Sequence, residues 1–191
     1  YEAGFHVSQA VPDATAWLSQ SLKSVNAVLG LTRTGKFRPY ALTPPAHAAV
    51  ATYDRRTIID VRETSLPASL SPPNWRRTVG YARNYTPQTS DLSPLLTSAQ
   101  SQALALAWSE AVWQDQAVSS RHPGARDGGR LETGLRDGLG AQVIADTLGA
   151  LWGGPRRTYE IDLALEPLRH DLGQTVVIDY PLGPLRGGAR A

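Results

Sequence analysis

Two neighbouring carboxylates are the residues of this sequence that come nearest to a catalytic pair. Glu160 and Asp162 are two positions apart in a segment that alternates between polar and apolar side chains. On a β-strand they point to the same side, with Cα atoms roughly 7 Å apart. Glycosidases use two such carboxyl groups, so the pair suggests a carbohydrate- or cell-wall-binding module or a glycoside hydrolase. We favour a simpler interpretation, a solvated polar face opposite Tyr159 and Ile161.

Other catalytic or metal-binding patterns are not found in the sequence. The chain has no cysteine, and none of its four histidines (His6, His47, His122 and His170) has a second histidine at metal-ligand spacing. A Ser–His–Asp triad assembles from distant positions and is not excluded by sequence, but no nucleophile-elbow motif indicates one. The glycines of 149–154 follow a helix, whereas phosphate-binding glycines precede one. We therefore expect no enzyme, cofactor or metal site.

Tryptophans provide a second kind of candidate, because exposed aromatic rings bind sugars or other proteins. Four of the five, at positions 17, 108, 113 and 152, fall in stretches with a helical pattern. We expect these four to be core or interface anchors. Trp75 follows a Pro-Pro loop and is the one that we expect to be exposed.

Composition limits the class of protein. The 191 residues carry a net charge of +2, 41% of them are hydrophobic, and 17 glycines and 14 prolines indicate many turns. Arginines occur in scattered pairs, not as a basic stripe, so nucleic-acid binding is not expected. No apolar run is long enough to span a membrane. The sequence contains no methionine and begins without signal-peptide features, so we expect an internal stretch of a longer polypeptide, with a processed mature protein as the alternative.

Periodicity predicts the elements of the N-terminal half. A helix capped by Asp13 should run to about Ser24, and a hairpin should follow, with strands at Asn26–Leu31 and Phe37–Leu42 around a Gly-containing turn. Pro39 places the second strand at a sheet edge. Further along, we expect a short strand at 48–53, a short helix at 54–61, a loop at 66–74 and a strand at 75–86.

The C-terminal half should continue with helices and end with strands. We expect a long helical stretch after Asp91 with an apolar side reaching Trp113, a flexible loop at 121–129, a helix at 141–152, and two strands at 157–165 and 175–180. The fold class is therefore α+β, with mixed helices, antiparallel strands and hairpins. We divide the chain into a hairpin-containing α/β subdomain (1–90), a helical segment (91–155) and a strand pair of a barrel-like domain that continues beyond the chain (156–191).

Three stretches resemble a known family. They are VLGLTRTGKFRPYAL, where a short helix precedes a hairpin with Gly and a basic residue in its turn; WRRTVGYARNYTPQ, which is similar to a Y-x-R-N-[WY]-T-x-Q pattern through Tyr81, Arg83, Asn84, Tyr85, Thr86 and Gln88; and the C-terminal RRTYEIDLALEPLRHDLGQTVVIDYPLGPLRGGAR. Together they resemble the tail-tip or baseplate hub proteins of tailed bacteriophages and related particles. Pro184, between Gly183 and Leu185, departs from the family's final turn.

The resemblance implies a structural role in the virion, after synthesis in the host cytoplasm. Family members form rings, typically homotrimers, in which barrel-like domains continue the tail tube and an α/β domain lies outside. This chain would hold the α/β domain and part of a tube-type β-barrel, and its partners would be itself, the tail tube and other tail-tip proteins. No catalytic residue carries over. The residues that we expect at interfaces are Phe37, Tyr40, Trp75, Tyr81, Arg83 and Tyr85.

Overall fold

The computed structural model describes residues 14–45, 48–66, 72–164, 170–181 and 183–190. Its helices are α1 (Ala14–Lys23), α2 (Ser98–Ala105), α3 (Gln116–Arg121), α4 (Gly138–Trp152) and the short 3-10 helix η1 (Gly183–Leu185). Its strands are β1 (Ala27–Leu31), β2 (Phe37–Ala41), β3 (Ala51–Tyr53), β4 (Ile58–Thr64), β5 (Asn74–Tyr81), β6 (Ser109–Gln114), β7 (Arg126–Glu132), β8 (Thr158–Leu163), β9 (Val176–Ile178) and β10 (Ala189–Arg190). The expected α+β class is confirmed, and the described strands form small open sheets, not a closed barrel.

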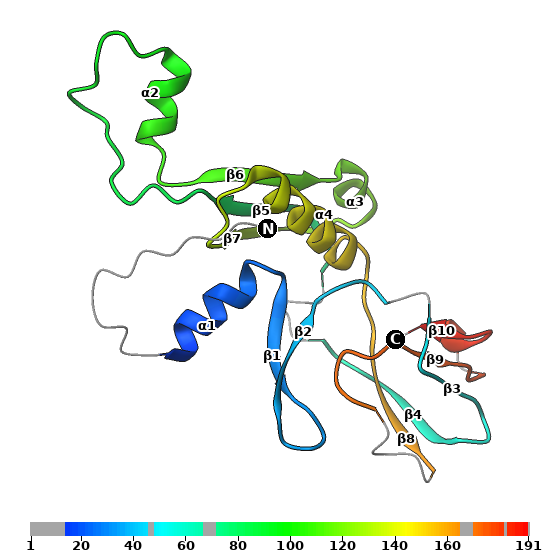
Figure 1. The fold of residues 1–191 in the computed structure, drawn as a ribbon. Coiled ribbons are helices and arrows are strands. Elements are labelled where there is room, and N and C mark those ends of the chain that lie inside the picture. The colour runs from blue at the N-terminus through cyan, green and yellow to red at the C-terminus, as the bar shows by residue number, and fades with distance from the viewer. Residues whose placement is uncertain (1–13, 46–47, 67–71, 165–169, 182, 191) are drawn as a thin grey trace.

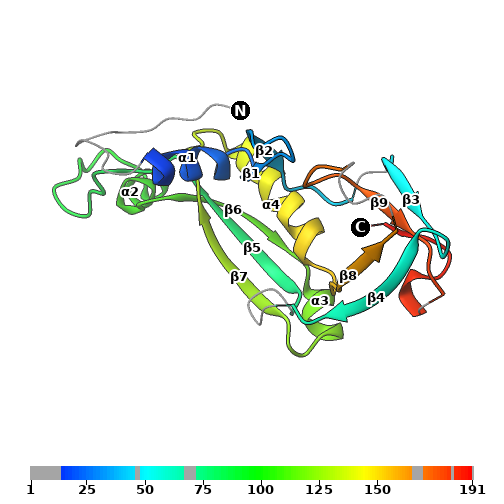
Figure 2. The same ribbon diagram turned by 90° about the horizontal axis from the view of Figure 1, so that it is seen from below.

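A helix packed on a three-stranded sheet forms one body of the molecule (Figures 1 and 2). β5 lies in the centre, antiparallel to β6 and parallel to β7. α4 covers one face of this sheet, because its residues at helical spacing bury a continuous apolar stripe. Val79, Leu135 and Ile144 are among the core residues, each at most 3% exposed.

Two smaller sheets share a second core. β4 pairs antiparallel with β8, and β9 lies between β10 and a parallel β3. Tyr53, Ile58, Ile178 and Leu185 are the buried residues of this core, and the inward side chains of β8 pack against them. The clean alternation of β8, with Tyr159 and the other apolar residues inward, confirms the strand expected there.

A hairpin and an arm extend from these bodies. β1 and β2 form a separate antiparallel ribbon, with Ala27 opposite Ala41 and Leu31 opposite Phe37, and α1 packs against β1. Residues 82–108 form the arm that carries α2 away from the sheet (Figure 1). Two backbone hydrogen bonds close its base, from the amide of Asn84 to the carbonyl of Ala107 and from Gln88 to Leu104.

The N-terminal predictions hold except at two places. α1 and the hairpin are confirmed, while the cap expected at Asp13 lies outside the described residues. The short helix expected at 54–61 is wrong. The Asp54 carboxylate instead accepts the amides of Arg56 and Thr57 at 2.8 and 3.3 Å, which makes a turn into β4. The strand expected at 75–86 ends at Tyr81, because Ala82 has a positive φ of 46°.

The segment 91–155 is not wholly helical. α4 is confirmed, but the long helix expected after Asp91 is wrong: only α2 is helical there, and Trp113 lies on strand β6. The last four residues of the loop expected at 121–129 belong to β7, which pairs with β5. The two C-terminal strands are not a pair either, because β8 pairs with β4 and β9 pairs with β3.

Candidate protein interface

Exposed apolar side chains gather on α1 and the hairpin. We call them the hairpin patch: Leu18, Val25, Val28, Leu29, Leu31 and Phe37. Phe37 is 74% exposed and Leu31, its partner across the ribbon, is 53% exposed. Single exposed apolar residues are ordinary, but a group on one small unit is typical of a contact surface.

The backbone of the hairpin is open as well. Within the described residues β1 and β2 pair only with each other, so each strand has a free edge. A free strand edge presents unpaired N–H and C=O groups that can pair with another chain. A groove of about 330 Å³ lies between α1 and β1, lined by Leu18, Leu22, Val28 and Leu29 among others. The hairpin thus offers both apolar area and hydrogen-bonding capacity to a neighbour.

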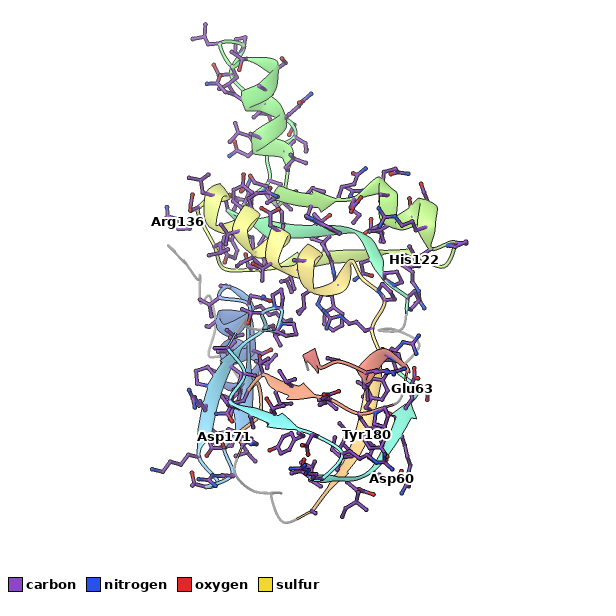
Figure 3. The ribbon with its side chains drawn as sticks, turned by 90° about the vertical axis from the view of Figure 1, so that its right-hand side faces the viewer. Asp60, Glu63, His122, Arg136, Asp171 and Tyr180 are labelled. Atoms are coloured by element: carbon purple, nitrogen blue, oxygen red, sulfur yellow. The ribbon has the colours of Figure 1, made fainter. Side chains whose placement is uncertain are left out.

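Tyr40 belongs to the hairpin but serves its internal packing. Its ring lies against Gly30, where a Cβ would come within 2.7 Å of the ring, and against Gly173, where the distance would be 3.1 Å. Near the hairpin turn, the amide of Arg33 donates to the Asp171 carboxylate at 3.0 Å (Figure 3). The segment around 171–173 therefore holds the hairpin in place through one ring contact and one hydrogen bond.

The other expected interface residues lie elsewhere. Trp75, expected to be exposed, is half-buried at the start of β5, and Tyr81 packs on the core beneath α4. Arg83 lies at the base of the arm, with its guanidinium 4.7 Å from the ring centre of Tyr85 and 5.4 Å from that of Trp108. The structure therefore does not bring the six residues together on one element: two are on the hairpin, two on β5 and two at the arm base.

Most of the hairpin patch and the exposed apolar residues of the arm were not predicted from the sequence. In the arm, Leu95 is 91% exposed and Leu106 is 56% exposed, and no residue of α2 is buried. The signal for the hairpin was the uncharged run of β1, which has apolar residues at successive positions where a half-buried strand would alternate.

The two carboxylates considered for sugar chemistry lie on an ion-paired strand face. Glu160 and Asp162 are exposed on β8, opposite Arg62 and Asp60 of β4. Arg62 bonds the Asp60 carboxylate at 2.8 Å and lies 3.6 Å from that of Asp162. The hydrogen bond from Arg62 lowers the pKa of Asp60, and the Val61 amide acts in the same direction. This is the arrangement expected of a solvated polar face.

A similar cluster covers the face of the larger sheet opposite α4. Arg130 lies between Glu110 and Glu132, with N···O distances of 3.4 and 2.9 Å. Its guanidinium also lies 6.0 Å from the ring centre of Trp108. Arg130 thus joins the carboxylates of β6 and β7 in an exposed ion-paired cluster, as Arg62 does on β4 and β8.

The described residues form charged clusters on two strand faces and an apolar patch on the hairpin. They contain no group of three or more histidine, aspartate or glutamate side chains that could hold a metal ion. No helix in the same ranges is long and apolar enough to cross a membrane. No protein-family model matches the chain, and no curated protein matches it in sequence.

Proposed function

We propose that this chain is a structural component of a protein assembly, and that the assembly is the tail-tip or baseplate hub ring of a phage or phage-like particle. The hairpin patch is the observation that supports the assembly role. A neighbouring chain that paired with a free edge of the hairpin would also cover Phe37 and Leu31, and so remove apolar surface from water.

The tail-hub part of the proposal rests on the sequence motifs and on where they fall. VLGLTRTGKFRPYAL forms the hairpin, YARNYT spans the end of β5 and the base of the arm, and LGQTVVIDY includes β9. The first motif thus coincides with the hairpin patch, and the second leads into the arm that carries the exposed Leu95 and Leu106. The partners would be further copies of the chain, three to a ring, with the tail tube and other tail-tip proteins beside them.

Intact particles provide the direct test of the tail assignment. Tryptic peptides of this chain should appear by mass spectrometry in purified particles from the source strain, at a few copies per particle beside the tail-tube protein. Their absence from particles, with the protein found free instead, would contradict the assignment. Sugar binding by the β8 face would then be the alternative to test.

The hairpin patch is tested by Phe37→Asp. Because Phe37 is 74% exposed, the charge should leave the fold intact but weaken association. Burial of such a ring contributes about 1.5–3 kcal/mol, so association should weaken by about 10- to 100-fold. Ile59→Asp is the matched control, since Ile59 is 67% exposed but lies on β4. Equal association of the two variants, measured by sedimentation, would remove the hairpin from the interface.

A further inference from the structure

Three arginines line a pocket beside the two smaller sheets, β4–β8 and β3–β9–β10, that share the second core. Arg55 and Arg56 belong to the turn between β3 and β4, and Arg186 follows η1. Figures 1 and 2 both show the β3–β4 turn beside the segment that joins β9 to β10. Asp54, Asp179 and Pro181 complete the lining of a cavity of about 620 Å³ that is open to solvent. We call it the arginine pocket.

The carboxylates of this pocket are engaged by the backbone. Asp54 Oδ1 accepts the amides of Arg56 and Thr57, and Asp179 Oδ1 accepts the amide of Gly187 at 3.0 Å. Within the described ranges, no hydrogen bond or ion pair engages the guanidinium groups that line the pocket. The other charged clusters differ, because Arg62, Arg130 and Arg157 each have a carboxylate within 4 Å. The side chains that line the pocket therefore carry a net charge of +1, and its three guanidinium groups are available to hydrogen-bond a ligand.

The loops that carry the arginines are fixed to the core. The amide of Asp179 donates to the carbonyl of Tyr53 at 2.8 Å, which ties the two loops together beside the pocket. Leu185, next to Arg186, is 2% exposed in the second core. A binding group on such loops loses little backbone freedom when a ligand arrives.

We propose that the arginine pocket binds a phosphate group. A guanidinium donates two parallel hydrogen bonds to an oxyanion. A carboxylate has two oxygens in one plane, whereas the four oxygens of a phosphate point in different directions and suit donors that come from two separate loops. The phosphate is either the free ion or an ester on a larger molecule, since the pocket is open. This proposal does not depend on the proposed assembly role.

Calorimetric titration of the purified chain with inorganic phosphate, in chloride buffer at constant ionic strength, tests the proposal. Saturable binding is expected, and Arg56→Gln/Arg186→Gln should weaken it at least tenfold. Lys36→Gln/Arg121→Gln removes the same charge from exposed sites elsewhere and should leave the affinity within about twofold. Arg186→Lys keeps the charge but loses the fork, so it should fall between the wild type and the double variant.

Two further probes identify the ligand class. Glycerol 3-phosphate that binds at least as tightly as inorganic phosphate would indicate an ester of a larger molecule, and weaker binding would indicate the free ion. Acetate that binds as tightly as phosphate would overturn the proposal, because the pocket would then select any anion. The absence of saturable phosphate binding, or an equal loss in both double variants that remain folded by circular dichroism, would overturn it too.

Discussion

Replacement of Gly149 in α4 by alanine should destabilise the protein, although the same change usually stabilises a helix. Alanine is favoured over glycine inside a helix by about 1 kcal/mol. At this position, however, the new Cβ would lie 2.0 Å from Cδ2 and 2.3 Å from Cε2 of Trp113. Trp113 projects from β6 toward α4, so the added methyl group would overlap the ring that joins helix and sheet.

The size of the effect follows from how little the ring can move. A Cβ on Gly153 would lie 2.8 Å from Cη2 of the same ring, so α4 crosses Trp113 at two glycines, one turn apart. Overpacking costs about 1–3 kcal/mol, and we expect the upper end because a rigid aromatic ring must shift by more than 1 Å. After the helix preference is subtracted, the net loss is about 2 kcal/mol. For a chain of this length the corresponding fall in Tm is about 4–8 °C.

Urea unfolding, followed by tryptophan fluorescence and circular dichroism, measures this loss. Gly154→Ala is the matched control, since Gly154 lies just beyond the helix and a Cβ there meets nothing within 4 Å. It should change the free energy of unfolding by less than about 0.5 kcal/mol. In a Trp113→Leu background the cost of Gly149→Ala should largely disappear. A Gly149→Ala protein as stable as the wild type would refute the packing argument.

Three further predictions concern hydrogen bonds. Ser24→Ala should cost about 1–3 kcal/mol in urea unfolding, because the buried Ser24 hydroxyl accepts the amide of Gly134 at 2.8 Å and the variant removes that acceptor. Thr97→Ala removes the capping box of α2 and should speed amide exchange in that helix about fivefold, since the helix buries no residue of its own. The Asp60 carboxyl should titrate below its ordinary pKa of 3.8 by NMR, and Arg62→Gln should raise that pKa. Its stabilising effect is therefore present above pH 3.8 and is lost as the pH falls through the lowered value.

Local signals in the sequence predicted the elements whose own residues show a helical period, a strand period or a turn glycine. The stripe of α4 and the alternation of β8 follow directly from helical and strand periods. The hairpin follows from Gly35, which has a φ of 76° in the turn and is open to solvent. Each of these elements can be predicted from its own residues, without knowing which other element it packs against.

The elements that the sequence did not predict depend on distant partners. β7 contains two glycines and four charged residues and looks like a loop, but β5 offers it an edge for parallel pairing. β6 follows the alanine-rich stretch of α2 so closely that both look like one helix. The extended cap at Leu106 separates them. β8 and β9 look like a pair because they are consecutive, yet each lies beside a strand from the first third of the chain.

The candidate interface was predictable only in part for a similar reason. Phe37 was expected at an interface from the resemblance and is exposed. Its exposure follows from the fold, because among the described strands the ribbon of β1 and β2 pairs with no other. A sequence pattern shows that β1 is apolar. It does not show whether another part of the chain covers it.

The hairpin has weak internal support, and this links its folding to its proposed role. Neither β1 nor β2 contains a buried residue, whereas the central strand β5 has three in succession. An isolated two-stranded hairpin is at best marginally stable in water, and here α1, Tyr40 and Asp171 supply most of what holds it. A neighbouring strand would add hydrogen bonds along a free edge and cover the apolar side chains at once. The residues that make the hairpin a weak folding unit are therefore those that would make it a strong contact, so its final order and the assembly would form together.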